Sequence, residues 1–131
     1  MYLLDSSAIL AHCFQETGFE VVAEALESGD CWVAAPSWFE LRIALARTGR
    51  DEELVAAYRE SVAGTLDITT EVADAAFAIR RACKGRIPAI DSLIAGAAKV
   101  RGFRLIHRDR HLAQIPAEML DQTSLPARGS K

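Results

Sequence analysis

Residues 1–14 read MYLLDSSAILAHCF: a short apolar run, an acid, two serines and a second apolar run. The first run, residues 2–4, suits a buried β-strand, and the second, residues 8–14, suits a helix. Ser6 and Ser7 stand between them and are favourable residues for capping the start of that helix. The stretch therefore predicts a strand, then Asp5, then a helix in direct succession.

The same alternation of strand and helix continues along the chain. Further strands are predicted at residues 31–34, 65–68 and 104–106, with an edge strand near residues 119–120. Helices are predicted between them, at residues 18–28, 36–47, 51–64, 69–82 and 89–100. This order predicts an α/β fold with a mainly parallel central sheet of four to five strands flanked by helices.

Length and composition favour one folded unit. The 131 residues fit a single domain, 1–131, in which about 121–131 is expected to be a loose tail. No apolar run approaches the ~20 residues of a membrane span, and the first residues lack the features of a signal peptide. We therefore expect a cytoplasmic protein with no membrane partner. Cys13, Cys31 and Cys83 lack CxxC spacing, which favours reduced thiols over disulfides or zinc ligands.

Four carboxylates stand where such a sheet would place a ligand site, at the carboxyl ends of its strands. Asp5 leaves the first strand, Asp109 follows the fourth, and Glu40 and Asp91 lie in early turns of helices. Crowded carboxylates raise one another's pKa unless a cation compensates their charge. Oxygen ligands suit Mg²⁺ or Mn²⁺, and these ions also accept phosphate oxygens. The four residues therefore indicate a metal site for phosphodiester chemistry.

The net charge of -3 is unusual for a protein that binds nucleic acid. If four of the 18 acids are metal ligands, however, the 15 Lys and Arg residues slightly outnumber the remaining acids. Many of these bases also fall in two groups, at residues 80–86 and 99–110, which suits local contact with phosphate. The overall charge thus does not argue against a nucleic-acid substrate.

Four segments carry these acids: DSS at residues 5–7, PSWFEL at 36–41, IPAIDSLIA at 87–95 and LIHRDRHL at 105–112. In this order and spacing they resemble the motifs of PIN-domain nucleases, and within them the short VapC-type toxins of bacterial toxin–antitoxin modules. The resemblance extends from Met1 to about Met119. The fourth segment departs from the pattern, because His107 stands where Thr or Ser is usual and His111 where an acid is common.

The resemblance implies that Asp5, Glu40, Asp91 and Asp109 are the catalytic metal ligands, with Ser7 a hydrogen-bonding residue behind them. It implies an endoribonuclease toxin in which one or two Mg²⁺ or Mn²⁺ ions activate the water that hydrolyses RNA. It also implies two protein partners, a VapB-type antitoxin and a second copy of the chain in a homodimer.

Other interpretations stay open at this point. His107 and His111 have the i,i+4 spacing of a metal-binding pair, but without a third His or Cys a hydrogen-bonded or phosphate-facing pair is favoured. His12, on an apolar helix, is expected to be structural. A receiver domain would need an acid at a mid-chain strand end, and a haloacid-dehalogenase-type phosphatase would need a second acid where Ser7 stands. The remaining alternative is a catalytically silent PIN-fold module that binds RNA or a partner.

Overall fold

A five-stranded parallel sheet runs through the centre of the computed structural model, which describes residues 1–127. Its strands, in chain order, are β1 (Tyr2–Leu4), β2 (Cys31–Ala34), β3 (Gly64–Leu66), β4 (Arg104–His107) and β5 (Gln122–Ser124). They lie in the order β3-β2-β1-β4-β5. The predicted α/β class with a parallel central sheet is therefore confirmed.

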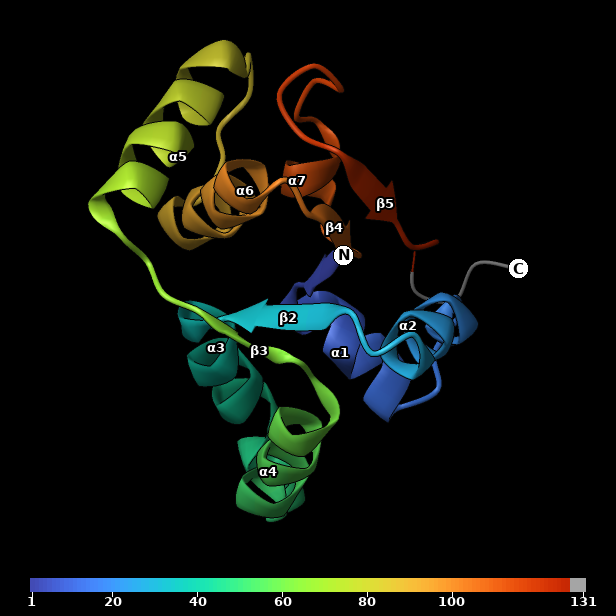
Figure 1. The fold of residues 1–131 in the computed structure, drawn as a ribbon. Helices are drawn as coiled ribbons and strands as arrows, with labels where there is room; N and C mark the ends of the chain where they lie inside the picture. Colours follow the sequence, from blue (N-terminus) through green and yellow to red (C-terminus); the bar gives the residue numbers. More distant parts are fainter. Residues whose placement is uncertain (128–131) are drawn as a thin grey trace.

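Helices cover both faces of this sheet, as Figure 1 shows. Their bounds are α1 (Ser6–Cys13), α2 (Phe19–Glu27), α3 (Ala35–Leu45) followed by a 3₁₀ turn η1 (Ala46–Thr48), α4 (Asp51–Ser61), α5 (Thr70–Ala82), α6 (Ala89–Arg101) and α7 (Arg110–Ala113). Helices α1 to α4 lie on one side and α5 to α7 on the other (Figure 1).

Strand β1 occupies the centre because its residues are apolar on both faces. Leu3 belongs to the core beneath α5 and α6, whereas Leu4 belongs to the core shared with α1 and α3, and both side chains are fully buried. Leu3 pairs with Leu105 and Leu4 with Ile106 in the adjoining β4. This register brings the carboxyl ends of β1 and β4 side by side, so the residues that follow the two strands meet.

Helix α6 is held close to α5 by a glycine. A Cβ atom at Gly96 would lie 2.7 Å from the Val72 carbonyl oxygen and 2.9 Å from the Ala76 nitrogen. Only glycine therefore allows the two helix backbones to approach this closely. The contact fixes the position of α6, and with it Asp91 in the first turn of that helix.

Three local predictions were wrong. The residue that caps α1 is Asp5, not Ser6 or Ser7, so the helix begins at Ser6. The edge strand lies at Gln122–Ser124, beyond the predicted residues 119–120. The expected tail at 121–131 therefore contains β5 and the buried Leu125, while residues 128–131 lie outside the described residues.

Two further features bear on the predictions from composition. All three cysteines are free. Among residues 1–127, every helix is too short or too polar to cross a lipid bilayer.

Candidate metal centre

Asp5 ends β1 and begins α1, and its carboxylate is almost completely buried, at 3% exposure. Oxygen Oδ2 accepts hydrogen bonds from the Ser7 backbone nitrogen at 3.2 Å and from Ser7 Oγ at 2.5 Å. Oxygen Oδ1 is buried and accepts no hydrogen bond from any residue between 1 and 127. Burial raises the pKa of Asp5, although the two bonds from Ser7 oppose that shift. A buried, unpaired carboxylate oxygen calls for a cation or a proton.

Asp109 has the equivalent position after β4. It caps α7, where Oδ1 accepts hydrogen bonds from the backbone nitrogens of His111 at 2.7 Å and Leu112 at 3.1 Å. Ser7 ties this strand end to that of β1, because Ser7 Oγ also accepts a hydrogen bond of 2.9 Å from the Arg108 nitrogen. Ser7 therefore bonds both to Asp5 and to the strand end that carries Asp109.

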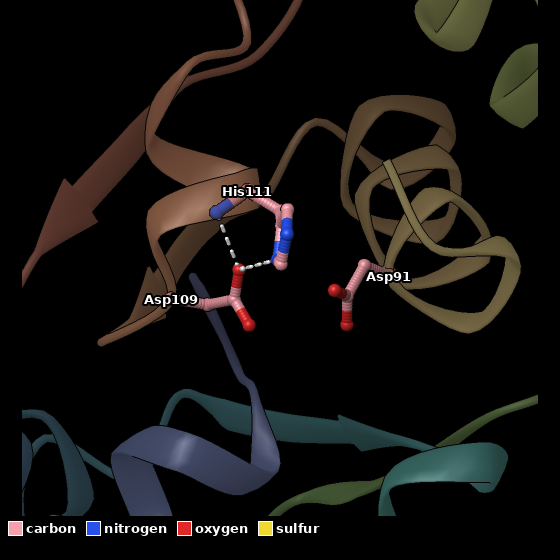
Figure 2. Close-up of side chains that lie close together, drawn as sticks. All are labelled: Asp91, Asp109 and His111. Carbon is pink, nitrogen blue, oxygen red and sulfur yellow. Dashed lines mark hydrogen bonds and ion pairs between the residues drawn. The ribbon is translucent and has the colours of Figure 1, made fainter. Parts of the chain in front are cut away.

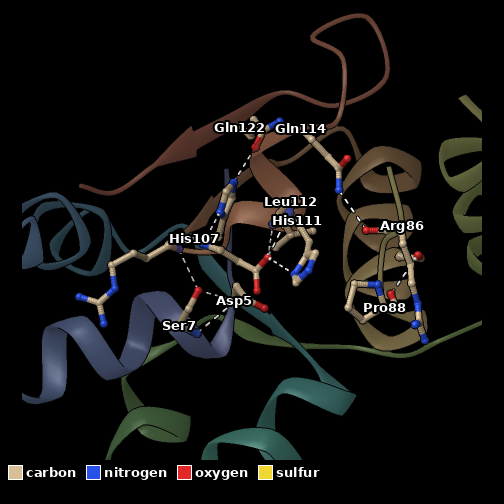
Figure 3. Close-up of polar contacts among 12 residues, drawn as sticks. Asp5, Ser7, Arg86, Pro88, His107, His111, Leu112, Gln114 and Gln122 are labelled. Atoms are coloured by element: carbon tan, nitrogen blue, oxygen red, sulfur yellow. Dashed lines mark hydrogen bonds and ion pairs between the residues drawn. The ribbon is translucent and has the colours of Figure 1, made fainter. Parts of the chain in front are cut away.

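His107 points toward Gln122 of β5 (Figure 3), and it supports Asp109 from that side. Its Nδ1 accepts a 3.0 Å hydrogen bond from the Asp109 backbone nitrogen, so the ring proton must lie on Nε2. Nε2 donates to Gln122 Oε1 at 2.5 Å, and Gln122 Nε2 donates to the Ile115 carbonyl at 3.0 Å. The ring is fully buried. Of the two options predicted for His107, the structure therefore shows the hydrogen-bonded one. Both ring nitrogens already have partners, so the ring is not free to contact phosphate.

The other two predicted acids come from helices. Glu40 lies in α3 and is half-buried, with Ser6 Oγ 3.4 Å from its Oε1. Burial and the charge of Asp5 raise the pKa of Glu40. Asp91 lies in the first turn of α6, and its pKa rises to about 7 because of burial and the charges of Asp109, Asp5 and Glu40. The four carboxylates therefore lie close enough to perturb one another, and the fold brings all of them together.

His111 also belongs to this cluster, although the sequence favoured a hydrogen-bonded or phosphate-facing pair with His107 over a metal ligand. Figure 2 shows its ring beside Asp109, with Asp91 opposite on α6. Potential ligand atoms of Asp91, Asp109 and His111 all lie within 4.8 Å of one another. The i,i+4 spacing suggested a pair with His107, but His107 points toward β5 instead. The sequence signal that could have placed His111 in the cluster is its i,i+2 spacing from Asp109. Asp109 caps α7 and accepts a hydrogen bond from the His111 backbone nitrogen, so the two residues are in contact. His12 lies elsewhere, 2.6 Å from the hydroxyl of Tyr58 on α4, as expected of a structural residue.

The donors in this cluster fit a divalent cation. Asp5 Oδ1 has no partner among the described residues, and Asp91 is raised in pKa by every group that acts on it. A bound cation would give Asp5 Oδ1 a partner and would lower the pKa of Asp91. Carboxylate oxygens are the ligands that Mg²⁺ and Mn²⁺ favour. The arrangement is therefore suited to hold such an ion, while the role of each acid as a ligand stays a prediction.

Several solved structures share this fold. The VapBC2 complex of Rickettsia felis, bound to a DNA fragment from its promoter, aligns with a TM-score of 0.76 at 13% identity, covering 95% of this chain and 98% of that one. DNA-bound VapBC from Salmonella typhimurium aligns at 0.73 and 20% identity, over 94% and 96% of the two chains. VapC20 of Mycobacterium tuberculosis, a sarcin–ricin loop cleaving toxin, aligns at 0.66 and 15% identity, over 86% and 93%.

The sequence itself identifies the family. No curated protein matches the chain significantly. The profile described as PIN domain, however, matches residues 2–118, which span β1 to α7 and include all four acids. The chain belongs to the PIN domain family.

Proposed function

We propose that this protein is a divalent-metal-dependent endoribonuclease and the VapC-type toxin of a toxin–antitoxin module. The observation that carries the proposal is the buried Asp5 Oδ1, which has no hydrogen-bond partner among residues 1–127 and lies amid three further carboxylates. Without a cation, this arrangement destabilises the fold. A protein that keeps such a cluster at the carboxyl edge of its sheet is suited to bind metal there.

The residues that would hold the ion are Asp5, Glu40, Asp91 and Asp109. Bound Mg²⁺ or Mn²⁺ supplies a Lewis acid that lowers the pKa of water and neutralises phosphate charge. Ser7 orients Asp5 by donating to Oδ2, which leaves Oδ1 free for a ligand. The N–H groups of α7 similarly hold Asp109 by Oδ1. Two of the four carboxylates are thus fixed before any ion arrives, which lowers the entropic cost of binding.

Cleavage of RNA by purified protein tests the enzymatic part. We expect Mn²⁺ or Mg²⁺ to support cleavage and EDTA to stop it. Asp91→Asn should lower the rate by at least about 100-fold because a ligand is lost. Asp74→Asn, the same change at an exposed acid of α5, is the matched control and should cleave like the wild type. Folded wild-type protein that cleaves no RNA with either metal would instead favour the catalytically silent PIN-fold module.

The proposed protein partners are a VapB-type antitoxin and a second copy of the chain. The exposed large apolar side chains include Phe39 and Ile43 on α3 and Phe77 on α5, and such surfaces are typical of protein contacts. An antitoxin helix on an apolar face could also direct an Arg or Lys at the carboxylates in place of metal. The solved relatives that are named VapBC support this choice of partner.

Growth measurements test the toxin assignment. Expression of the protein alone should arrest growth, and co-expression of the product of the adjacent small gene should relieve the arrest. The Asp91→Asn variant should be harmless at equal expression. Normal growth with abundant soluble wild-type protein would contradict a toxin role. Light scattering tests the homodimer, and a monomer mass at micromolar concentration would contradict it.

A further inference from the structure

His111 is a potential metal ligand to which the proposed function assigns no role. It lies in the first turn of α7, and its backbone is held by the 2.7 Å bond from its nitrogen to Asp109 Oδ1. The ring is about one third exposed, with a side-chain exposure of 37%. Figure 2 shows it in the space between Asp109 and Asp91, which lie on different elements. The cap of α7 therefore holds the backbone of His111 beside Asp109.

An ordinary ion pair with Asp109 does not explain the ring. Its Nδ1 lies 3.4 Å from Asp109 Oδ1, whereas charge-assisted N–H···O bonds are about 2.7–2.9 Å long. Asp109 Oδ1 is also already occupied by two backbone N–H groups. This oxygen therefore offers the ring little further bonding. A ring nitrogen of His111 instead lies within reach of an ion shared with Asp91 and Asp109.

The spacing suits an ion shared by the three side chains. Ligand atoms of Asp91, Asp109 and His111 lie within 4.8 Å of one another. Donors bound about 2.1 Å from an ion lie up to about 4.2 Å apart, so small side-chain rotations would enclose one. Asp5 points independently to a cation in this region, because its Oδ1 is buried without a partner among the described residues and its pKa responds to the charge of Asp109.

We propose that His111 is a nitrogen ligand of the metal in this centre and shifts its preference from Mg²⁺ toward Mn²⁺ and other first-row ions such as Co²⁺. Mg²⁺ binds oxygen almost exclusively, whereas imidazole is a good ligand for the later ions. Unlike a carboxylate, a histidine also brings no negative charge to the ion, which weakens Mg²⁺ most because its binding is the most electrostatic. The inference rests on the metal centre of the proposed function and specifies which ion that centre takes.

Electron spin echo spectroscopy of protein loaded with Mn²⁺ tests the ligand directly. We expect ¹⁴N coupling from a directly bound imidazole in the wild type and none in His111→Asp or His111→Ala. His107 cannot supply this signal, because both of its ring nitrogens are already hydrogen-bonded. Circular dichroism melting should first establish that each variant is folded. Wild-type protein without ¹⁴N coupling, or folded protein that binds no Mn²⁺, would overturn the inference.

Calorimetric titration of the metal-free protein with Co²⁺ and with Mg²⁺ tests the selectivity. His111→Asp should lower the ratio of Co²⁺ to Mg²⁺ affinity by at least about tenfold, because an oxygen replaces a nitrogen. Ala113→Asp, at an exposed residue of α7, is the control that adds a carboxylate without replacing the ring. An equal change in the control would assign the effect to charge alone and overturn ligation.

These measurements separate the inference from the proposed function. Nitrogen coupling without RNA cleavage by any metal would leave His111 a ligand and contradict the nuclease. Metal-dependent cleavage without nitrogen coupling would support the nuclease and contradict ligation by His111.

Discussion

The acidic centre has two halves that hold their carboxylates in different ways. Asp5 and Asp109 follow strands, and each accepts hydrogen bonds from the helix that it caps. Glu40 and Asp91 project from helices, where Glu40 has one long contact with Ser6 and Asp91 is raised in pKa by burial and by three other acids. The strand half therefore supports the fold as well as the site, whereas the helix half costs the fold stability until a cation binds.

This difference means that one residue type has opposite effects on stability within a single cluster. Removing an acid that caps a helix removes a bond that the fold uses. Removing an acid that only repels its neighbours removes a cost. The comparison gives four predictions, from the largest expected effect to the smallest.

Metal binding should join the two halves and give the largest change. At a concentration one hundred times its dissociation constant, an ion that binds only the native state adds about 2.7 kcal/mol to the free energy of unfolding. We expect chemical denaturation in saturating Mn²⁺ to show this gain for the wild type and much less of it for Asp91→Asn. Equal protection of both proteins would remove Asp91 from the ligand set.

Ser7→Ala should lower the free energy of unfolding by about 1–3 kcal/mol. The substitution removes the hydroxyl that accepts a hydrogen bond from the Arg108 N–H and donates one to Asp5 Oδ2. Ser6→Ala is the matched control one residue earlier, where the contact with Glu40 is 3.4 Å long. Its effect should stay within about 0.5 kcal/mol. Urea denaturation in EDTA measures both variants, and similar losses would show that Ser7 does not tie the strand ends together.

Substitutions at Asp109 and Asp91 should rank in opposite order. Asn caps a helix about as well as Asp, so Asp109→Asn should be more stable than Asp109→Ala by about 0.5–2 kcal/mol. Asp91 caps nothing, so Asp91→Ala should be at least as stable as Asp91→Asn, since Ala is the better helix former. Thermal melts of the four variants in EDTA test this ranking. The same order at both positions would contradict the distinction between the two halves.

Asp91→Asn should raise the stability of the metal-free protein by roughly 0.5–1 kcal/mol. Asp91 gains from the dipole of α6, but its pKa is still raised from 3.8 to about 7, so burial and repulsion outweigh that gain. With the folded pKa above the unfolded one, the wild type loses stability as the pH rises from about 4 to 7. The advantage of the variant should therefore be absent near pH 4 and complete by pH 8. Melting in EDTA across this range tests the sign, and a variant less stable than the wild type at pH 8 would contradict it.

The order of elements could be predicted because strong local signals agree with the packing. The run at residues 2–4 is apolar throughout because β1 is buried on both faces, and Gly102 and Pro88 mark the ends of α6. Strand β5 was misplaced for a physical reason. Met119 and Leu120 look more like a strand, but β5 is an edge strand of polar residues whose place is set by backbone pairing with β4. Gln122 is recognisable only once its bond to His107 is known.

The centre itself was only partly visible in the sequence. Asp5, Glu40, Asp91 and Asp109 could be selected by their positions after strands and in early helical turns. The division into two halves could not, because it depends on which backbone N–H groups each carboxylate meets. His111 could be named only as one of a histidine pair, because the backbone bond that places it beside Asp109 is formed in the folded chain.

The bond between Ser7 and Arg108 joins residues separated by 101 positions and has a consequence for the timing of folding. Contacts between such distant residues require a large loop to close and therefore form late. During synthesis, Asp5, Glu40 and Asp91 leave the ribosome well before β4 and Asp109. A nascent chain therefore lacks the second strand end until residues 104–111 have emerged and paired with β1. If the protein cuts RNA as proposed, this order keeps the site incomplete until β4 and Asp109 have been synthesised.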